Sequence, residues 1–376
     1  MRGAVQLTLM IGPAVPMPVP RSVLDALTSV RVSTFSGDLP SGFELNFSLG
    51  KNSPLNTLFL ISGGAGIPLL RVLLIVTMNG TPTVLIDGVM THHQVQPGAG
   101  GAPSTLRVQG KDKSTVMSYL DFDGVPYPAM PPEARALIMI AKYAWLGLIP
   151  VVIPSIIPDL PIPIERIPRH IGTDLEYIKL IARQSGYVFY IDSGPAPGVS
   201  IAYWGPEIRV GAPQPALNID MDAHTNVDSI SFRYDKEAKE MPVIFIQEPT
   251  TKAPIPIPIP DITPLNPPLG VIPPLPPKLK FLKATAKMSP LQAAMTGLAY
   301  ASQHADAVFA SGTLDVVRYG RVLKSRQLVG VRGAGAAYDG LYYVKSVGHS
   351  IERGQYKQSF ELARNGLLST IPKVPA

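Results

Sequence analysis

Cysteine is absent from this 376-residue chain, and its absence excludes several kinds of chemistry. Without thiols the chain can form no disulfide, no thiolate nucleophile and no cysteine-ligated zinc site. Charged residues are also scarce, at 16% of the chain against about a quarter in typical soluble domains, while 46% of the residues are hydrophobic. Such a composition requires either a large apolar core or further surface that is buried in an oligomer.

Dense basic runs are missing as well, and the formal net charge is only +6. Nucleic-acid recognition depends on a basic patch or stripe, so we expect no nucleic-acid partner. An apolar stretch from Ala136 to Ile164 raises the question of a membrane span. It is interrupted by Lys142 and by five prolines, which a continuous helix does not tolerate. We therefore expect no stable membrane insertion.

Motifs for catalysis and cofactor binding are lacking. The chain has no GxSxG or HExxH, and its glycine cluster SGGAGIP (Ser62 to Pro68) lacks the lysine and hydroxyl residue of a phosphate loop. Asp121 and Asp123 in DFDG have the composition of a turn. The neighbours His92 and His93 point to opposite faces of a strand and cannot readily share a metal. The sequence predicts no catalytic residue, no metal site and no cofactor.

Proline, in contrast, is abundant at 41 residues. It is concentrated in two stretches, Pro150 to Pro168 and Ala253 to Leu279. Each proline fixes its own φ angle and biases the preceding residue away from helix, so both stretches are expected to be extended. The second is either a flexible insertion or an ordered arm, and its aliphatic residues favour an arm that packs against another surface.

The remaining patterns predict β-structure at both ends of the chain, with a small α/β unit between them. Alternating strands occupy the first hundred residues, including a hairpin around Asn79-Gly80. Helical spacing then places four apolar residues on one face: Ala134, Leu137, Ile138 and Ala141. A second helix begins with Thr173 or Asp174 as its cap, carries an apolar stripe (Leu175, Ile178, Ile181, Ala182) and stops at Gly186. The strand-rich pattern returns from Val227, and a helix is expected over about 289–308.

The last hairpin, DGLYYVKSVGHSIERGQYKQSFELARNGL (339–367), turns at Arg353-Gly354. In its second strand the alternation gives one apolar face (Tyr356, Phe360, Leu362) and one polar face (Lys357, Ser359, Glu361). In its first strand, Leu341, Tyr343 and Val347 oppose Tyr342, Val344 and Ser346, so both faces are partly apolar. A barrel wall that also packs against a neighbouring protomer would hide both faces.

Several of these segments resemble one protein family. TDLEYIKLIARQSGYVFYID, AYWGPEIRVGAP and the block from VLKSRQLVG to ELARNGL look like the baseplate hub proteins of contractile injection systems. These are the phage late control D-like hubs, the N-terminal hub portion of type VI spike proteins, and the hubs of phage-tail-like extracellular systems. The resemblance spans nearly the whole chain, and its most specific parts are the C-terminal block and Asp174 to Asp192.

The resemblance implies an α+β, mainly β protein with two tube-type β-barrel domains, an inserted small α/β domain and proline-rich extended arms. The expected limits are 1–115 for the first barrel, 116–225 for the middle domain and 226–376 for the second barrel, with a proline-rich insertion at 251–279. Family hubs are homotrimers, and their six barrels join the hexameric inner tube to the trimeric spike. This resemblance implies a structural part with no enzymatic activity, which sheath contraction drives out together with the tube and spike.

The expected partners are a separate spike protein, because this chain ends at Ala376 soon after the second barrel, the inner tube, other baseplate components and possible cargo. Assembly is expected in the bacterial cytoplasm, within a phage tail or a related particle. For contacts between subunits, or with the tube or spike, we select Tyr342, Tyr343, Lys357, Glu361 and Arg364. Two alternatives stay open: a membrane-associating protein that uses the proline-aliphatic arms, and a cell-wall glycan hydrolase with Asp121, Asp123 and Glu176.

Overall fold

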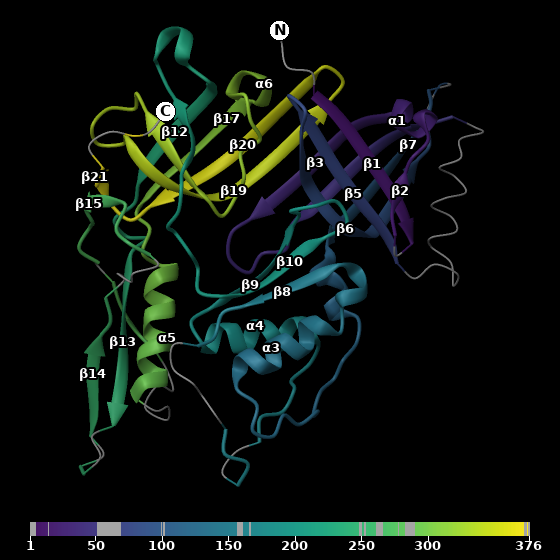
Figure 1. Cartoon of the computed structure of the whole chain (residues 1–376). Coiled ribbons are helices and arrows are strands. Elements are labelled where there is room, and N and C mark those ends of the chain that lie inside the picture. Colours follow the sequence, from purple (N-terminus) through teal and green to yellow (C-terminus); the bar gives the residue numbers. More distant parts are fainter. Residues whose placement is uncertain are drawn as a thin grey trace.

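The computed structural model describes residues 5–13, 15–50, 69–98, 100, 102–155, 161–164, 167–247, 250–251, 253–260, 266–276, 278–282, 290–371 and 374. The glycine cluster at 62–68 lies outside these residues, as do parts of both proline-rich stretches. The described chain is mainly β, with a large sheet, a smaller α/β unit beneath it and a separate arm (Figure 1). The predicted α+β, mainly β fold class is confirmed.

The large sheet has 13 strands, and both β-rich regions of the sequence contribute to it. The first region supplies β1 (Val5–Pro13), β2 (Met17–Pro18), β3 (Leu27–Phe35), β4 (Gly42–Leu49), β5 (Leu70–Met78), β6 (Thr81–Gln96) and β7 (Ser104–Asp112), with helix α1 (Arg21–Ala26). The second supplies β11 (Gln214–Asn218), β12 (Val227–Tyr234), β17 (Val308–Asp315), β18 (Leu328–Arg332), β19 (Gly340–Glu352) and β20 (Gln355–Arg364), with helix α6 (Val316–Tyr319) and the short turn η3 (Asp222–His224).

The two regions join where β3 pairs antiparallel with β19. The main path of the sheet runs β2-β1-β5-β6-β7-β4-β3-β19-β20-β17-β12, and β18 pairs with β19 and β11. One hydrophobic core serves both regions, since Phe47 and Val72 belong to the same cluster as Tyr342 and Phe360. Among the described residues, β2 and β12 are the two end strands of this path and do not pair with each other. The closed barrels therefore stay a prediction, and so do the domain limits.

The middle unit has its own core between a three-stranded sheet and two helices. It comprises η1 (Lys113–Ser118), α3 (Pro132–Ala141), η2 (Ala144–Leu146), β8 (Leu148–Val152), α4 (Asp174–Gln184), β9 (Val188–Ser193) and β10 (Ser200–Gly205). Helix α4 begins as predicted: the Thr173 hydroxyl accepts from the Glu176 backbone N–H, and the Glu176 carboxylate accepts from the Thr173 N–H. Gly186, which follows α4, has the left-handed φ of +75° expected of a helix stop.

Helix α3 presents its predicted apolar face to solvent. Leu137 and Ile138 are exposed, as is Ala141, whereas Ala136, Met139 and Ile140 form the buried side. The helix therefore buries one apolar side in its own unit and leaves a second apolar side uncovered. Among the described residues, no helix is both long and apolar enough to cross a bilayer.

The arm consists of β13 (Glu240–Gln247), β14 (Pro254–Pro258), β16 (Lys278–Phe281) and helix α5 (Pro290–Gln303). Its sheet order is β14-β13-β16, and α5 covers one face of it (Figure 1). The predicted helix is therefore present but ends before 308, where β17 begins. A further small pair, β15 (Gly270–Ile272) with β21 (Leu367–Ser369), ties the proline-rich segment to the end of the large sheet.

Candidate functional site: a polar face across the large sheet

A row of polar residues crosses the large sheet from β20 to β6. Strand register aligns these side chains in neighbouring positions: Lys357, Ser350, Arg31, Glu44, Gln109 and His92. Since side chains alternate between the faces of a strand, residues aligned in this way share one face of the sheet. The row passes the β3–β19 junction without interruption, so a single polar face belongs to both β-rich regions.

Glu44 on β4 is the centre of charge on this polar face. Its carboxylate accepts hydrogen bonds from Gln109 Nε2 at 2.9 Å and Asn46 Nδ2 at 3.1 Å. Arg107 and Arg31 lie 3.6 and 3.7 Å from it. The hydrogen bond from Gln109, followed by that from Asn46 and the two guanidinium charges, holds the pKa of Glu44 below its usual value. The carboxylate is thus kept ionised and fixed in position.

Hydroxyl groups dominate the part of the face that β12, β17, β19 and β20 supply. Ser229 and Thr313 hydroxyls lie 2.9 Å apart, and those of Ser231 and Ser311 lie 3.1 Å apart. Ser346 on β19 donates to Glu361 on β20 at 3.0 Å. Small polar side chains that bond to one another leave a level, water-compatible surface with few long side chains.

The polar face is hollowed beside the Glu44 cluster. A cavity of about 520 Å³ is lined by Arg31, Glu44, His92, Gln109 and Lys111, among others. A second groove, of about 1070 Å³, lies at the tip of the terminal hairpin and includes Arg353, Lys357 and Asp228. Both hollows are open surfaces in which a chain or another protein could lie.

Lys357 and Glu361, two of the five residues selected for contacts, lie on this face. Lys357 is exposed and forms an ion pair with Asp228 at 3.2 Å, and Glu361 is exposed next to Ser346. The inward-facing residues of β20 were also predicted: Tyr356, Phe360 and Leu362 are buried, each with 2% or less of its surface exposed.

The other three selected residues, Tyr342, Tyr343 and Arg364, are buried inside the chain. Tyr342 and Arg364 have 0% of their surface exposed and Tyr343 has 2%. The Arg364 guanidinium lies 4.5 Å from the centre of the Tyr342 ring and donates to the carbonyls of Ala337 and Asp339. These contacts hold the loop before β19, so the three side chains are occupied within one protomer.

A bulge in β19 explains why the sequence misplaced part of this strand. Val344 pairs with Leu362 and Ser346 with Glu361, which leaves Lys345 as an extra residue. Beyond it Val347 points to the core with Tyr342 and Val344, and does not share the face of Leu341 and Tyr343 as predicted. The second apolar side, formed by Leu341 and Tyr343, packs against Leu269 and Leu328 of the same chain and needs no neighbouring protomer.

The carboxylates considered for catalysis hold local structure. Asp121 accepts from the backbone N–H of Asp123 at 2.8 Å, and Glu176 belongs to the cap of α4. In the described part of the chain no cluster of three His, Asp or Glu residues is placed to hold a metal. His349, in the core of the large sheet, has its pKa lowered to about 4 by burial.

A buried ion cluster, which the sequence did not reveal, fixes the middle unit to the large sheet. Asp87 on β6 accepts from Arg71 at 2.6 and 2.7 Å and lies 2.7 Å from the Lys113 ammonium. Lys113 donates to the Ser200 hydroxyl and Arg71 to the Gly198 carbonyl, both in the middle unit. Burial lowers the pKa of Lys113 to about 8, although Asp87 opposes the shift. The only sequence signal was an isolated charge in each of two apolar runs, LLRVLLIV and VLIDGV.

Comparison with known proteins was made with both sequence and structure. No protein-family model and no curated relative matches the sequence. Solved structures do match. The 43 kDa tail protein of prophage MuSo2 from Shewanella oneidensis is similar over 96% of this chain and 99% of its own, with a TM-score of 0.64 and 13% identity. A tail protein from Neisseria meningitidis MC58 is similar over 97% of this chain and 98% of its own, with a TM-score of 0.62 and 11% identity.

A third similar structure is a chain of the Francisella PdpA-VgrG complex. The similarity covers 99% of this chain but 55% of that one, with a TM-score of 0.61 and 7% identity. At these identities the shared property is the fold, and it extends over essentially all of this chain. The fold is that of phage tail proteins, as the resemblance in the sequence predicted.

Proposed function

We propose that this chain is a structural baseplate hub of a contractile injection system. Three copies form a ring that joins the hexameric inner tube to a trimeric spike, adapts sixfold to threefold symmetry, and leaves with them when the sheath contracts. The particle is a phage tail or a related device assembled in the bacterial cytoplasm. The similarity in fold to tail proteins over nearly the whole chain supports a structural protein of a tail or baseplate. The polar face supports a place in the wall of the ring.

The uninterrupted polar row is the observation that carries the proposal. A ring that conducts material needs a hydrophilic inner wall, and a protomer with two β-regions must present it from both. Here the row from Lys357 to His92 runs across both regions and their junction. The free edges at β12 and β2 then pair across subunits, which removes the hazard of an exposed edge strand. Lys357 and Glu361 are our candidates for contact with the lumen contents or the tube.

Co-expression with the tube and spike proteins of the same gene cluster tests the ring. We expect trimeric rings by electron microscopy and a threefold mass by light scattering. A chain that stays monomeric at high concentration and forms no ring with its spike would overturn the proposal.

Thiol labelling tests the polar face, because the natural chain has no cysteine. Ser359→Cys places a thiol on the polar face, and Lys236→Cys is a matched exposed control in the turn after β12. In assembled rings we expect a small maleimide to reach both thiols, whereas a bulky polyethylene-glycol maleimide reaches only the control. Equal labelling of both by the bulky reagent would place the polar face outside the lumen.

A further inference from the structure

The arm is a small sheet, and the described residues of the chain place a helix on one of its faces only. Helix α5 packs on Ile244 and Ile259, and a Cβ at Gly297 would lie 2.7 Å from Ile259 Cγ1, so helix and sheet are in close contact there. On its other side α5 meets the middle unit, where Gly186 lies against Ala299. The helix therefore stands between the arm sheet and the rest of the protomer (Figure 1).

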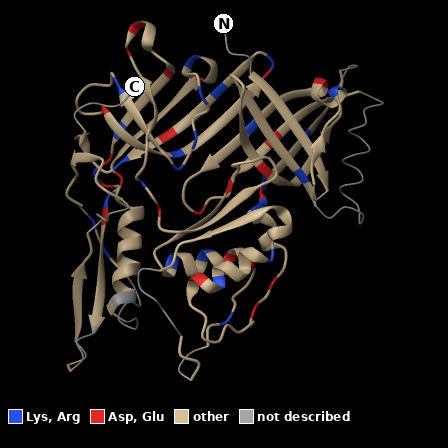
Figure 2. Ribbon diagram, in the orientation of Figure 1, with Lys and Arg blue, Asp and Glu red and all other residues tan. Residues whose placement is uncertain are grey.

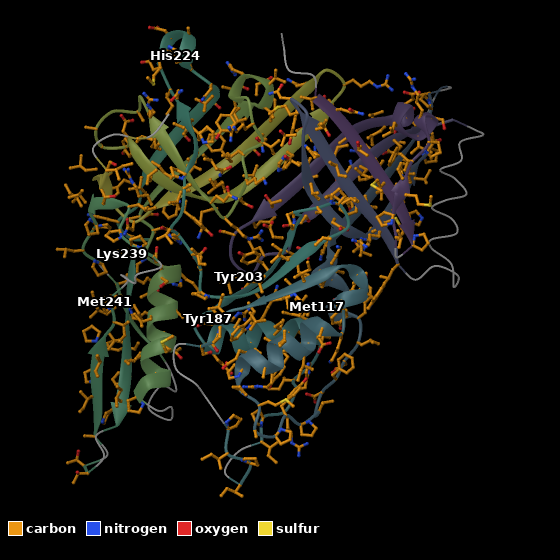
Figure 3. The ribbon with its side chains drawn as sticks, in the orientation of Figure 1. Met117, Tyr187, Tyr203, His224, Lys239 and Met241 are labelled. Carbon is orange, nitrogen blue, oxygen red and sulfur yellow. The ribbon has the colours of Figure 1, made fainter. Side chains whose placement is uncertain are left out.

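The opposite face of the arm sheet, the outer arm face, is apolar; it is exposed along β16, whereas Val243 at its centre is buried and Met241 and Phe245 are half-buried. Register aligns Met241 with Leu279 and Val243 with Phe281, and Phe245 stacks on Phe281 with ring centres 5.7 Å apart. Leu279 is 59% exposed and Phe281 is 56% exposed. Figure 2 shows β13, β14 and α5 almost free of charged residues, and Figure 3 places Met241 at the end of the arm near the body. An apolar sheet face of this kind is typical of a protein contact.

The β14 edge of the arm sheet is closed to the addition of another strand. The backbone N–H of Ile259 donates to the Pro242 carbonyl on β13. Backbone groups alternate in direction along a strand, so every second residue of β14 before Ile259 also points its nitrogen to β13, and the residues between them point theirs away. The nitrogens of Pro254, Pro256 and Pro258 therefore point to the open edge, and they carry no hydrogen. An added strand would find carbonyl acceptors but no donors. Along β14, contact with the arm must therefore use the face of the sheet.

A second surface on the same chain has matching chemistry. Leu137, Ile138 and Ala141 lie on one side of α3 at helical spacing and are exposed, and Trp145 in the following turn η2 is exposed as well; we call these four residues the α3 stripe. Trp145 is 55% exposed and Leu137 is 46% exposed. This α3 stripe carries no charge, as the outer arm face carries none. The arm cannot fold onto its own α3, because α5 lies between.

We propose that the outer arm face docks on the α3 stripe of a second copy of this chain. A closed ring of identical subunits requires a heterologous interface, in which two different surfaces of one chain complement each other. The outer arm face and the α3 stripe are such a pair. The proposal rests on the ring of the proposed function and names the surfaces that join its members.

Crosslinking of single-cysteine variants provides the direct test. Phe281→Cys and Ile138→Cys are purified separately, mixed, assembled with the spike and treated with a short bismaleimide. We expect a covalent dimer containing one of each variant. The pair Lys236→Cys with Ile138→Cys is the control and should give none. Rings that assemble without the Phe281–Ile138 product would overturn the docking.

Charge insertion provides the second test. Phe281→Asp should abolish ring formation while the isolated chain still folds, with at most a small loss in melting temperature from the stacking on Phe245, since more than half of the Phe281 surface is exposed. Ile255→Asp, an exposed residue of the same arm on the α5 side, is the control and should still assemble. Normal rings from Phe281→Asp would overturn the docking and leave the hub proposal intact. A wild-type chain that never forms rings would overturn both.

Flotation with phosphatidylcholine vesicles separates a protein contact from a lipid contact. We expect the chain to remain unbound. Binding to vesicles that Phe281→Asp abolishes would assign the outer arm face to a membrane and overturn the docking.

Discussion

The outer faces of the two sheets differ in kind, although each sheet buries its other face in an apolar core. On the large sheet the outer side chains bond to one another, as Glu44 does with Gln109 and Ser346 with Glu361. On the arm the outer side chains are Leu279, Phe281 and prolines, which have no polar partner to offer. The polar face of the large sheet is compatible with water, whereas the outer arm face would bury its apolar side chains only against another protein.

The core of the large sheet contains many more residues than the core of the arm. A substitution in this larger core should therefore have the largest effect on stability. Phe360→Ala removes a ring with 2% exposure from the core shared by both β-regions, and we expect a loss of about 3–5 kcal/mol in the free energy of unfolding. Denaturant unfolding followed by far-ultraviolet circular dichroism, which reports the β-strands, measures this. A loss below about 1 kcal/mol would mean that the two regions do not share one cooperative core.

A substitution in the small core of the arm is the counterpart of Phe360→Ala in the large sheet. Ile244→Ala opens a cavity under α5, in a core cluster that contains only a few residues. We expect faster hydrogen exchange in β13 and α5, with protection of the large sheet unchanged. Uniform loss of protection would show that arm and sheet unfold as one unit.

Acid should weaken the large sheet before the arm. His349 has a pKa of about 4 in the folded chain, while the unfolded side chain titrates near about 6.5. Between these values the unfolded state binds a proton that the folded state does not, so stability falls as the pH drops from about 6.5 to 4, by about 3 kcal/mol in all. Urea unfolding at several pH values measures the slope. His349→Gln should flatten it, and a slope that stays unchanged in this variant would contradict the assignment.

The smallest effect is expected on the polar face. Glu44 has a lowered pKa, so its contribution is present at neutral pH and is lost as the pH falls through that lowered value. Glu44→Gln should cost about 0.2–1 kcal/mol at pH 7, the range of exposed ion pairs, and the difference from wild type should shrink on acidification. A difference that grows toward acid would contradict the assigned role of the carboxylate.

Local features of this fold could be predicted from the sequence because they depend on neighbouring residues. The cap at Thr173, the alternation along β20 and the turn at Gly354 all follow from a few adjacent positions. The joining of β3 to β19 could not be predicted, because more than 300 residues separate Val32 from its partner His349. The bulge at Lys345 was missed for another reason: both sides of β19 are apolar before it, so the shift of the core positions from Val344 to Val347 does not stand out in the pattern.

For the candidate surfaces the same limits apply. Lys357 and Glu361 are exposed, as alternation alone predicts, and their role in contacts stays a prediction. The burial of Tyr342, Tyr343 and Arg364 could not be predicted, because their cover comes from distant segments, such as Leu269 and the carbonyls near Asp339. The face of α3 was identified by its spacing, but spacing alone does not tell which of two apolar sides meets the core.

The extra residue in β19 has a consequence for the phase of the strand. With a period of two, an uninterrupted strand would place Ser346 on the face of Val344 and Val347 on the face of Tyr343. The ladder skips Lys345, so Ser346 instead pairs with Glu361 on the polar face and Val347 points to the core with Val344. The skipped residue is free for other contacts: its carbonyl accepts from the Ser36 N–H, and its ammonium lies 3.7 Å from Asp306, the buried partner of Arg209. Lys345 therefore has no pairing partner on β20, and its other contacts join three distant parts of the chain.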